Sequence, residues 1–66
     1  MKRQKLKEFL SCFSLLVEIE IRTEKNLIEA EYIGNLLTLN IDKYGDMTVR
    51  DVLPLDNRLL IYLEDK

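Results

Sequence analysis

Paired carboxylates are the side chains of this sequence best suited to acid–base chemistry, because it contains no histidine and a single cysteine. Two such pairs, Glu18/Glu20 and Glu29/Glu31, alternate with apolar residues. Alternation places both members of a pair on one face of a strand, and we expect that face to contact water. Exposed carboxylates keep ordinary pKa values and do little general acid catalysis at pH 7. The sequence therefore predicts a protein that is not an enzyme.

Thiol and metal chemistry are not expected either. Cys12 lies in an apolar run and is predicted to be a core residue, since a reactive thiol needs a base or a strongly basic environment. Asp42 and Asp46 flank a glycine-containing segment, but two carboxylates lack the remaining ligands of a Ca²⁺ or Mg²⁺ loop. We expect an ordinary turn there. The sequence thus predicts no metal and no cofactor.

Nucleic-acid binding is the alternative that the charge distribution leaves open. Residues 1–8 hold four basic and one acidic side chain, a net charge of +3, whereas residues 9–66 hold six basic and eleven acidic side chains, a net charge of −5. The candidate phosphate contacts are Lys2, Arg3, Lys5 and Lys7. Such a run is more often a solvated helix face. The tyrosines that have the shape to stack on bases, Tyr32, Tyr44 and Tyr62, have mainly acidic neighbours.

An amphipathic helix is expected at the start of the chain. Leu6, Phe9, Leu10 and Phe13 recur at helical spacing, and the positions between them are mostly charged. This pattern predicts a helix of about three turns over residues 2–13. Its basic residues lie at the N-terminal end, where they oppose the helix dipole. The helix is therefore expected to depend on docking against the rest of the protein.

Two strands with alternating character are expected next. The first covers residues 16–23 and the second residues 28–32, with a polar connection between them, which is the pattern of a hairpin. The pair Gly34-Asn35 is predicted to be the turn that ends the second strand. Residues 37–41 alternate again and are either a third strand or a crossing loop.

The last third of the chain is expected to form a second hairpin. Thr48–Pro54 matches both a strand and a short capped helix, and we favour the strand because of its β-branched residues and the turn that follows. Pro54 then indicates an edge strand or a bulge. Residues 58–64 form the final strand. These elements predict one α+β domain over residues 1–66: an N-terminal amphipathic helix followed by a small four- or five-stranded antiparallel sheet.

The final strand suggests how such a protein acts. Its apolar run, residues 59–63, would face both sides of the sheet, so both sides need a cover. A 66-residue core rarely supplies more than about 3–5 kcal/mol, and burial in a complex would add stability. We therefore expect protein contact that uses an open strand edge and the face of Leu60 and Tyr62, with Tyr32 as a further interface residue. A homo-oligomer is expected, with a dimer favoured.

Membrane and export signals are not expected. The apolar run over residues 9–17 is too short to span a bilayer and no small-x-small cleavage pattern follows it. A lone cysteine cannot form an internal disulfide, which is typical of a reducing compartment. The prediction is a cytoplasmic protein without membrane contact.

Two resemblances add expectations about function. A basic N-terminal helix before a small, strongly bent sheet is similar to the order of elements in Sm-like proteins, which form rings and bind single-stranded RNA. In that family Asp-x-x-Met-Asn precedes the third strand and Arg-Gly follows the fourth. Here Gly-Asn-Leu-Leu at 34–37 and Pro-Leu-Asp-Asn-Arg at 54–58 stand at those places. The resemblance implies the subunit of an RNA-binding oligomer.

The second resemblance covers most of the chain. Leu-Lys-Glu-Phe-Leu at 6–10, Val-Glu-Ile-Glu-Ile at 17–21 and Pro-Leu-Asp-Asn-Arg-Leu-Leu-Ile-Tyr at 54–62 resemble small uncharacterised proteins of phages and mobile elements in low-GC Gram-positive bacteria. This likeness implies an accessory protein that acts by direct contact, for example on a host defence protein. A small non-enzymatic binding protein is the first hypothesis for function, and the Sm-like RNA-binding subunit is the alternative.

Overall fold

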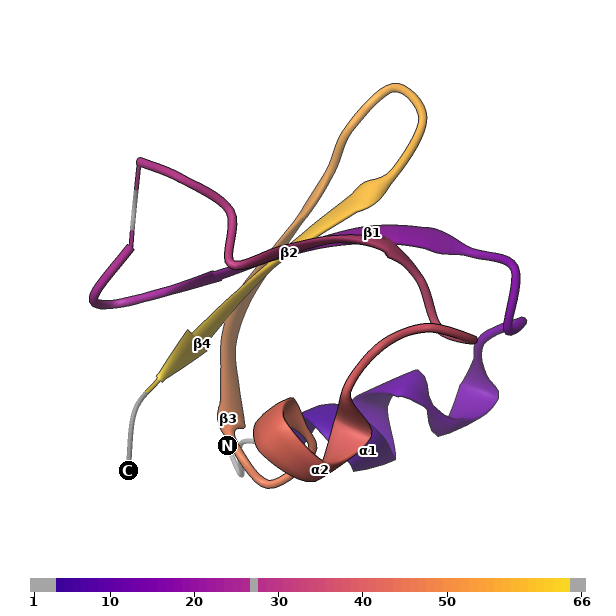
Figure 1. The fold of residues 1–66 in the computed structure, drawn as a ribbon, viewed down its shortest axis with the longest axis horizontal. Coiled ribbons are helices and arrows are strands. Elements are labelled where there is room, and N and C mark those ends of the chain that lie inside the picture. Colours follow the sequence, from indigo (N-terminus) through magenta and orange to yellow (C-terminus); the bar gives the residue numbers. More distant parts are fainter. Residues whose placement is uncertain (1–3, 27, 65–66) are drawn as a thin grey trace.

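A four-stranded sheet with short helical segments packed on one side forms the protein (Figure 1). The structure is a computed structural model that describes residues 4–26 and 28–64. The strands are β1 Glu18–Thr23, β2 Tyr32–Asn35, β3 Thr48–Pro54 and β4 Leu59–Glu64. The helical segments are α1 Leu6–Phe9, the 3-10 turn η1 Leu10–Cys12 and α2 Ile41–Tyr44. The predicted α+β class is confirmed.

The sheet is mixed, so the prediction of a purely antiparallel sheet is wrong. Its strand order is β2-β1-β4-β3, and the two outer pairs are antiparallel. The two central strands run parallel, with Ile19 opposite Leu59 and Thr23 opposite Leu63. Between β2 and β3 the chain crosses from one edge of the sheet to the other, so the second hairpin arrives with β4 beside β1. The most apolar strand thereby gains a strand on each side.

The second hairpin follows the sequence prediction. Thr48–Pro54 is a strand, antiparallel to β4, and its alternative as a short helix is excluded. The backbone N–H of Leu55 donates to the carbonyl of Arg58 at 2.8 Å and closes the turn. Pro54 lies on an edge strand, as predicted, where its missing N–H leaves no gap in the sheet.

The N-terminal helix is shorter than predicted. Instead of three turns over residues 2–13, one α-helical turn passes into the 3-10 turn η1, and residues 2 and 3 lie outside the described part of the chain. The Ser11 hydroxyl donates to the carbonyl of Glu8 at 2.7 Å, a local bond that competes with regular helix bonding. The basic residues at the N-terminal end add nothing favourable to the dipole. Leu6 and Leu10 nevertheless reach the core, as the spacing required.

The strand predicted over residues 28–32 is largely a loop, and β2 begins at Tyr32. Glu31 is drawn inward by hydrogen bonds, which bends the segment before the strand. Gly34 is a strand residue and not the predicted turn, because the Tyr32 phenol lies across it: a Cβ at this position would be 2.5 Å from the phenol oxygen. A glycine is needed here because a side chain approaches the backbone closely, and not because the backbone turns.

Residues 37–41 form no strand, so the crossing loop is the correct alternative. The short helix α2 follows, and its preceding residue Asn40 accepts a hydrogen bond from the backbone N–H of Lys43 at 3.2 Å. Asparagine is a preferred residue at this position, because its side chain satisfies a free N–H of the first turn.

The core lies between the helical segments and one face of the sheet, which we call the inner face. It is formed by Leu6, Leu10, Ile19, Ile21, Leu39, Tyr44, Ile61 and Leu63. Cys12 is exposed, so the prediction of a core cysteine is wrong: it lies outside the helical spacing of Leu6 and Leu10, which do reach the core. Within residues 4–26 and 28–64, no helix is long and apolar enough to cross a membrane.

Candidate protein-contact face

The opposite side of the sheet, which we call the outer face, carries a row of side chains that crosses all four strands. Ile33 of β2, Glu20 of β1, Leu60 of β4 and Leu53 of β3 lie opposite one another in register. The two ends of the row are open to water, with Ile33 56% and Leu53 45% exposed, whereas Leu60 is 6% exposed. The outer face therefore presents two apolar side chains around a buried centre.

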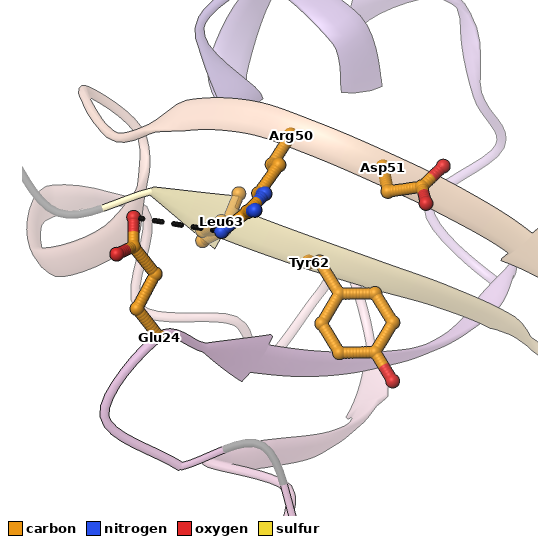
Figure 2. Close-up of a pocket in the computed structure, with 5 residues that line it drawn as sticks. All are labelled: Glu24, Arg50, Asp51, Tyr62 and Leu63. Carbon is orange, nitrogen blue, oxygen red and sulfur yellow. Dashed lines mark ion pairs between the residues drawn. The ribbon is translucent and has the colours of Figure 1, made fainter.

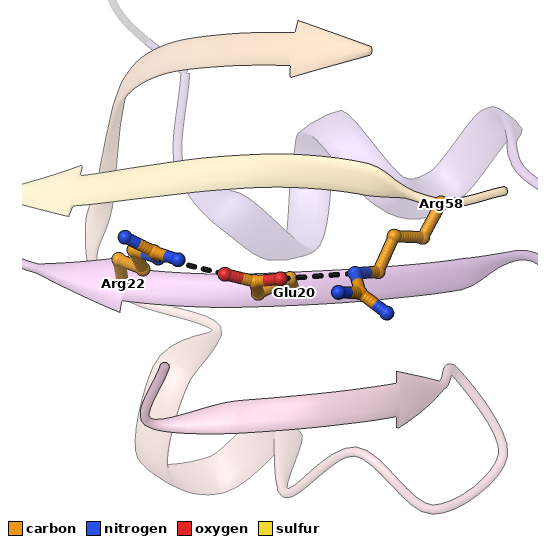
Figure 3. A network of polar contacts seen from close by, with 3 residues as sticks. All are labelled: Glu20, Arg22 and Arg58. Carbon is orange, nitrogen blue, oxygen red and sulfur yellow. Dashed lines mark hydrogen bonds and ion pairs between the residues drawn. The ribbon is translucent and has the colours of Figure 1, made fainter. Parts of the chain in front are cut away.

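A buried ion network occupies that centre. The Glu20 side chain is 3% exposed and lies between two guanidinium groups (Figure 3). Arg22 Nε donates to one carboxylate oxygen at 2.7 Å, and Arg58 Nε donates to the other at 2.9 Å. The Arg22 hydrogen bond lowers the pKa of Glu20, against the opposing effect of burial, and the charges of both arginines add to the lowering. The carboxylate is thus held ionised and fully paired.

Arg58 ties the hairpin turn to the middle of the sheet. It precedes β4, and its side chain reaches across to β1 over the outer face (Figure 3). The Arg58–Glu20 pair joins residues 38 positions apart in sequence. The Arg58 side chain is 35% exposed, so part of it belongs to the surface that a partner would meet on the outer face.

The row below contains Arg22, Tyr62 and Asp51, which also lie in register across three strands. Tyr62 is half-buried, so part of this side chain is accessible from the outer face. The row from Ile33 to Leu53 and the row of Arg22, Tyr62 and Asp51 together form a surface with both apolar and charged groups, a mixture that is also found in protein interfaces.

The two edges of the sheet differ in how open they are. Along β3, backbone bonds join Val49 to Gln4 and Leu6 to Met47, so the N-terminal segment covers the first part of this edge. Farther along, the N–H of Val52 donates to the Asp51 carboxylate and Pro54 has no N–H. These features block strand addition. The edge beyond β2, at the other side of the sheet, has no neighbouring strand among the described residues.

The residues predicted for protein contact divide between the two faces. Leu60 and Tyr62 lie on the outer face, beside Glu20 and Arg22 respectively. Tyr32 lies opposite Ile21 and packs against the core on the inner side, and its hydroxyl donates to the carbonyl of Asn35 at 2.7 Å. The structure therefore brings Leu60 and Tyr62 together and places Tyr32 elsewhere.

The described part of the basic N-terminus is engaged in ion pairs. Lys7 Nζ lies 2.8 Å and Lys5 Nζ 3.9 Å from the same oxygen of Asp46, and all three side chains are about half exposed. The hydrogen bond from Lys7 to Asp46 raises the pKa of Lys7. Lys2 and Arg3, the other two candidate phosphate contacts, lie outside the described residues. One carboxylate thus partly neutralises two of the four predicted cations.

Not all of the carboxylates that were expected to be solvent-exposed are exposed. Glu20 is buried, and Glu31 is half-buried at the base of the loop that follows β1, so this expectation is wrong for both. Thr23 donates to Glu31 at 2.6 Å, Asn26 at 3.2 Å and Tyr44 at 3.3 Å. The Thr23 hydrogen bond is the main cause of the lowered pKa of Glu31. Both glutamates are satisfied as anions, which is a structural role.

The segment from Asp42 to Asp46, predicted to be an ordinary turn, is the end of the short helix α2 and the turn that follows it. Asp42 is in the first turn of α2 and Asp46 pairs with the lysines. Within the described ranges, no group of three or more histidine, cysteine, aspartate or glutamate residues is placed to hold a metal ion. The hydroxyl of the buried Tyr44 donates to Glu31 at 3.3 Å, as part of the same hydrogen-bonded cluster.

The ion network is the feature that the sequence pattern did not predict. Glu20 and Arg22 are two residues apart on a predicted strand, so their shared face was foreseeable. The participation of Arg58 was not, because it requires the parallel pairing of β1 with β4. Comparison of the chain with protein-family models, with curated proteins and with solved structures finds no match.

Proposed function

We propose that this chain is a small non-enzymatic binding protein that acts by direct contact of its outer face with another protein. The observation that supports this most strongly is that the helices lie on the inner side of the sheet, while Ile33 and Leu53 on the outer side are about half exposed (Figure 1). Removing exposed apolar side chains from water stabilises a complex, so Ile33 and Leu53 would favour binding of a partner around the paired charges.

The setting of this contact follows from the sequence. The likeness to small phage and mobile-element proteins supports an accessory protein that inhibits or modulates a host protein, such as one used in defence. The lone cysteine supports action in the cytoplasm, which is the host cytoplasm for a phage protein. Self-association into a dimer remains a prediction, and the mass in solution by light scattering tests it.

The experiment compares capture of host proteins by the wild type and by two matched variants. Ile33→Glu places a charge on the outer face, and Leu37→Glu places the same charge at a leucine of similar exposure, 60%, away from the sheet. A protein captured from a lysate of a low-GC Gram-positive bacterium should be retained by wild type and Leu37→Glu and lost with Ile33→Glu. Equal capture by all three folded proteins would contradict the proposal.

RNA binding by an Sm-like oligomer remains the alternative prediction, and salt dependence separates it from protein contact. If the four cations at residues 2, 3, 5 and 7 act together on single-stranded RNA, the logarithm of affinity falls with that of salt with a slope of about −3. The Asp46 pairing of Lys5 and Lys7 is the reason that we place protein contact first.

A further inference from the structure

A hollow lies on the outer face beside Tyr62, at the place where β3 is irregular. Its volume is about 320 Å³, and it is lined by Glu24, Arg50, Asp51, Tyr62 and Leu63 (Figure 2). The register of β3 against β4 shifts between Val49 and Asp51, so Arg50 is the extra residue of a bulge. Bulges redirect side chains, and this one places Asp51 directly opposite Tyr62.

The charges of the hollow are only loosely paired. Glu24 and Arg50 approach to 4.0 Å, the limit of an ion pair, and their side chains are 47% and 56% exposed. Pairs of this kind contribute little and exchange readily. Asp51 uses one oxygen to accept from the N–H of Val52 at 2.9 Å, and its second oxygen has no hydrogen-bond partner among the described residues. Acceptor capacity for an additional donor is therefore present.

The wall of the hollow suits a cation with an apolar stem. Two carboxylates outnumber the single guanidinium, so the net charge of the lining is negative. The Tyr62 ring forms one side, and Leu63, whose side chain is buried in the core, follows it along β4 (Figure 2). A guanidinium or ammonium group can form charge-assisted hydrogen bonds with a carboxylate and a cation–π contact with an aromatic ring at the same time. An incoming carboxylate would meet Arg50 but would be repelled by Glu24 and Asp51.

We propose that this hollow receives a basic side chain, an arginine or a lysine, from the protein partner; this rests on the proposed function and names the chemistry of its partner. The cation pairs with the second oxygen of Asp51, with its stem along the Tyr62 ring, and Glu24 adds negative charge on the far side of Arg50 (Figure 2). A second copy of this chain, docked face to face, is a poor source of that cation. Arg22 and Arg58 are engaged by the buried Glu20, and Arg50 is already part of the hollow.

The test is a titration of the ¹⁵N-labelled protein with N-acetyl-arginine N-methylamide, followed by backbone amide shifts. We expect saturable shifts centred on Glu24, Arg50, Asp51 and Tyr62. The double variant Glu24→Gln/Asp51→Asn should weaken this binding about fivefold or more, since charge-assisted pairing at a partly exposed site is removed. Retained signal dispersion shows that the variant is folded, and Glu18→Gln, at another exposed glutamate of the outer face, should bind like wild type.

Three outcomes would overturn the inference. One is that the norleucine analogue, which has the apolar stem without the charge, binds as tightly as N-acetyl-arginine N-methylamide. Another is stronger binding of the N-acetyl-glutamate analogue, and the third is unchanged affinity in the double variant. None of these results bears on capture by the face around Ile33, so the inference and the proposed function fail separately.

Discussion

Replacing Glu20 by glutamine should destabilise the fold more than any other single charge removal on the sheet. The substitution keeps the size of the side chain and removes its charge, leaving Arg22 and Arg58 beside a neutral amide. In the native protein each arginine donates one hydrogen bond to this carboxylate, at 2.7 and 2.9 Å, and the carboxylate is 3% exposed. Both bonds are charge-assisted and meet at a site with little water.

The expected size of the effect follows from these contacts. A hydrogen bond to a charged group contributes about 1.5–3 kcal/mol, and breaking a buried pair costs about 3–5 kcal/mol. The Arg22 and Arg58 side chains are 26% and 35% exposed, so water recovers part of this loss. We therefore expect Glu20→Gln to lower the free energy of unfolding by about 2 kcal/mol. In a domain of this size that is about half of the total stability.

Urea denaturation followed by circular dichroism measures this change as a lower midpoint with an unchanged slope. Glu18→Gln is the matched control, because Glu18 is on the same strand and face but exposed, and it should change stability by less than about 0.5 kcal/mol. If Glu20→Gln unfolds at the same urea concentration as Glu18→Gln, the ion network contributes nothing and our view of the outer face is wrong.

Two further predictions concern pH and a glycine. The pKa values of Glu20 and Glu31 are lowered in the folded state, so their contribution to stability is present above the ordinary pKa of 4.5 and is lost as the pH falls through the lowered values. The urea midpoint should be level at neutral pH and drop below about pH 4.5, with a smaller drop in Glu20→Gln; equal drops would refute the assignment. Gly34→Ala should cost about 1 kcal/mol, because its Cβ displaces the Tyr32 hydroxyl from its hydrogen bonds. The cost should shrink in a Tyr32→Phe background, and strictly additive effects in the double variant would exclude this contact as the cause.

Periodicity sufficed for the elements whose apolar residues form one continuous pattern. β1, β3 and β4 were predicted with small errors at their ends, and so was the edge position of Pro54. The reason is local: alternation and β-branched residues favour a strand whichever neighbours it finds. The buried positions Leu6 and Leu10 were equally apparent from helical spacing, although the helix itself is short.

Long-range contacts explain what the sequence could not show. The strand expected over residues 28–32 is lost because Glu31 bonds to Thr23 and Tyr44, which are 8 and 13 positions away. Gly34 resembled a turn signal, whereas a tyrosine ring explains it. The parallel pairing of β1 and β4 depends on the crossing of the whole middle segment, and no local pattern encodes it.

The same limit applies to the candidate site. Leu60 and Tyr62 lie on the face opposite the core, as an apolar run that faces both sides of a strand predicts, and their contact with a partner stays a prediction. Tyr32 was assigned to the same surface, but the register places it opposite Ile21 on the inner side. Glu20 was expected in water, but it is buried and paired with both Arg22 and Arg58, and the Arg58 contact depends on the parallel pairing of β1 with β4.

Site-specific photo-crosslinking tests most directly that the outer face is the contact surface. A benzophenone amino acid replaces Leu53 on the outer face or Leu37 on the other side, two exposed leucines at which the added bulk extends into water. After irradiation in a lysate of a low-GC Gram-positive bacterium, we predict one dominant adduct from position 53 that is absent from position 37, and whose yield falls when Ile33→Glu is added. An adduct from position 37 alone, or one that is indifferent to Ile33→Glu, would contradict the proposed binding surface.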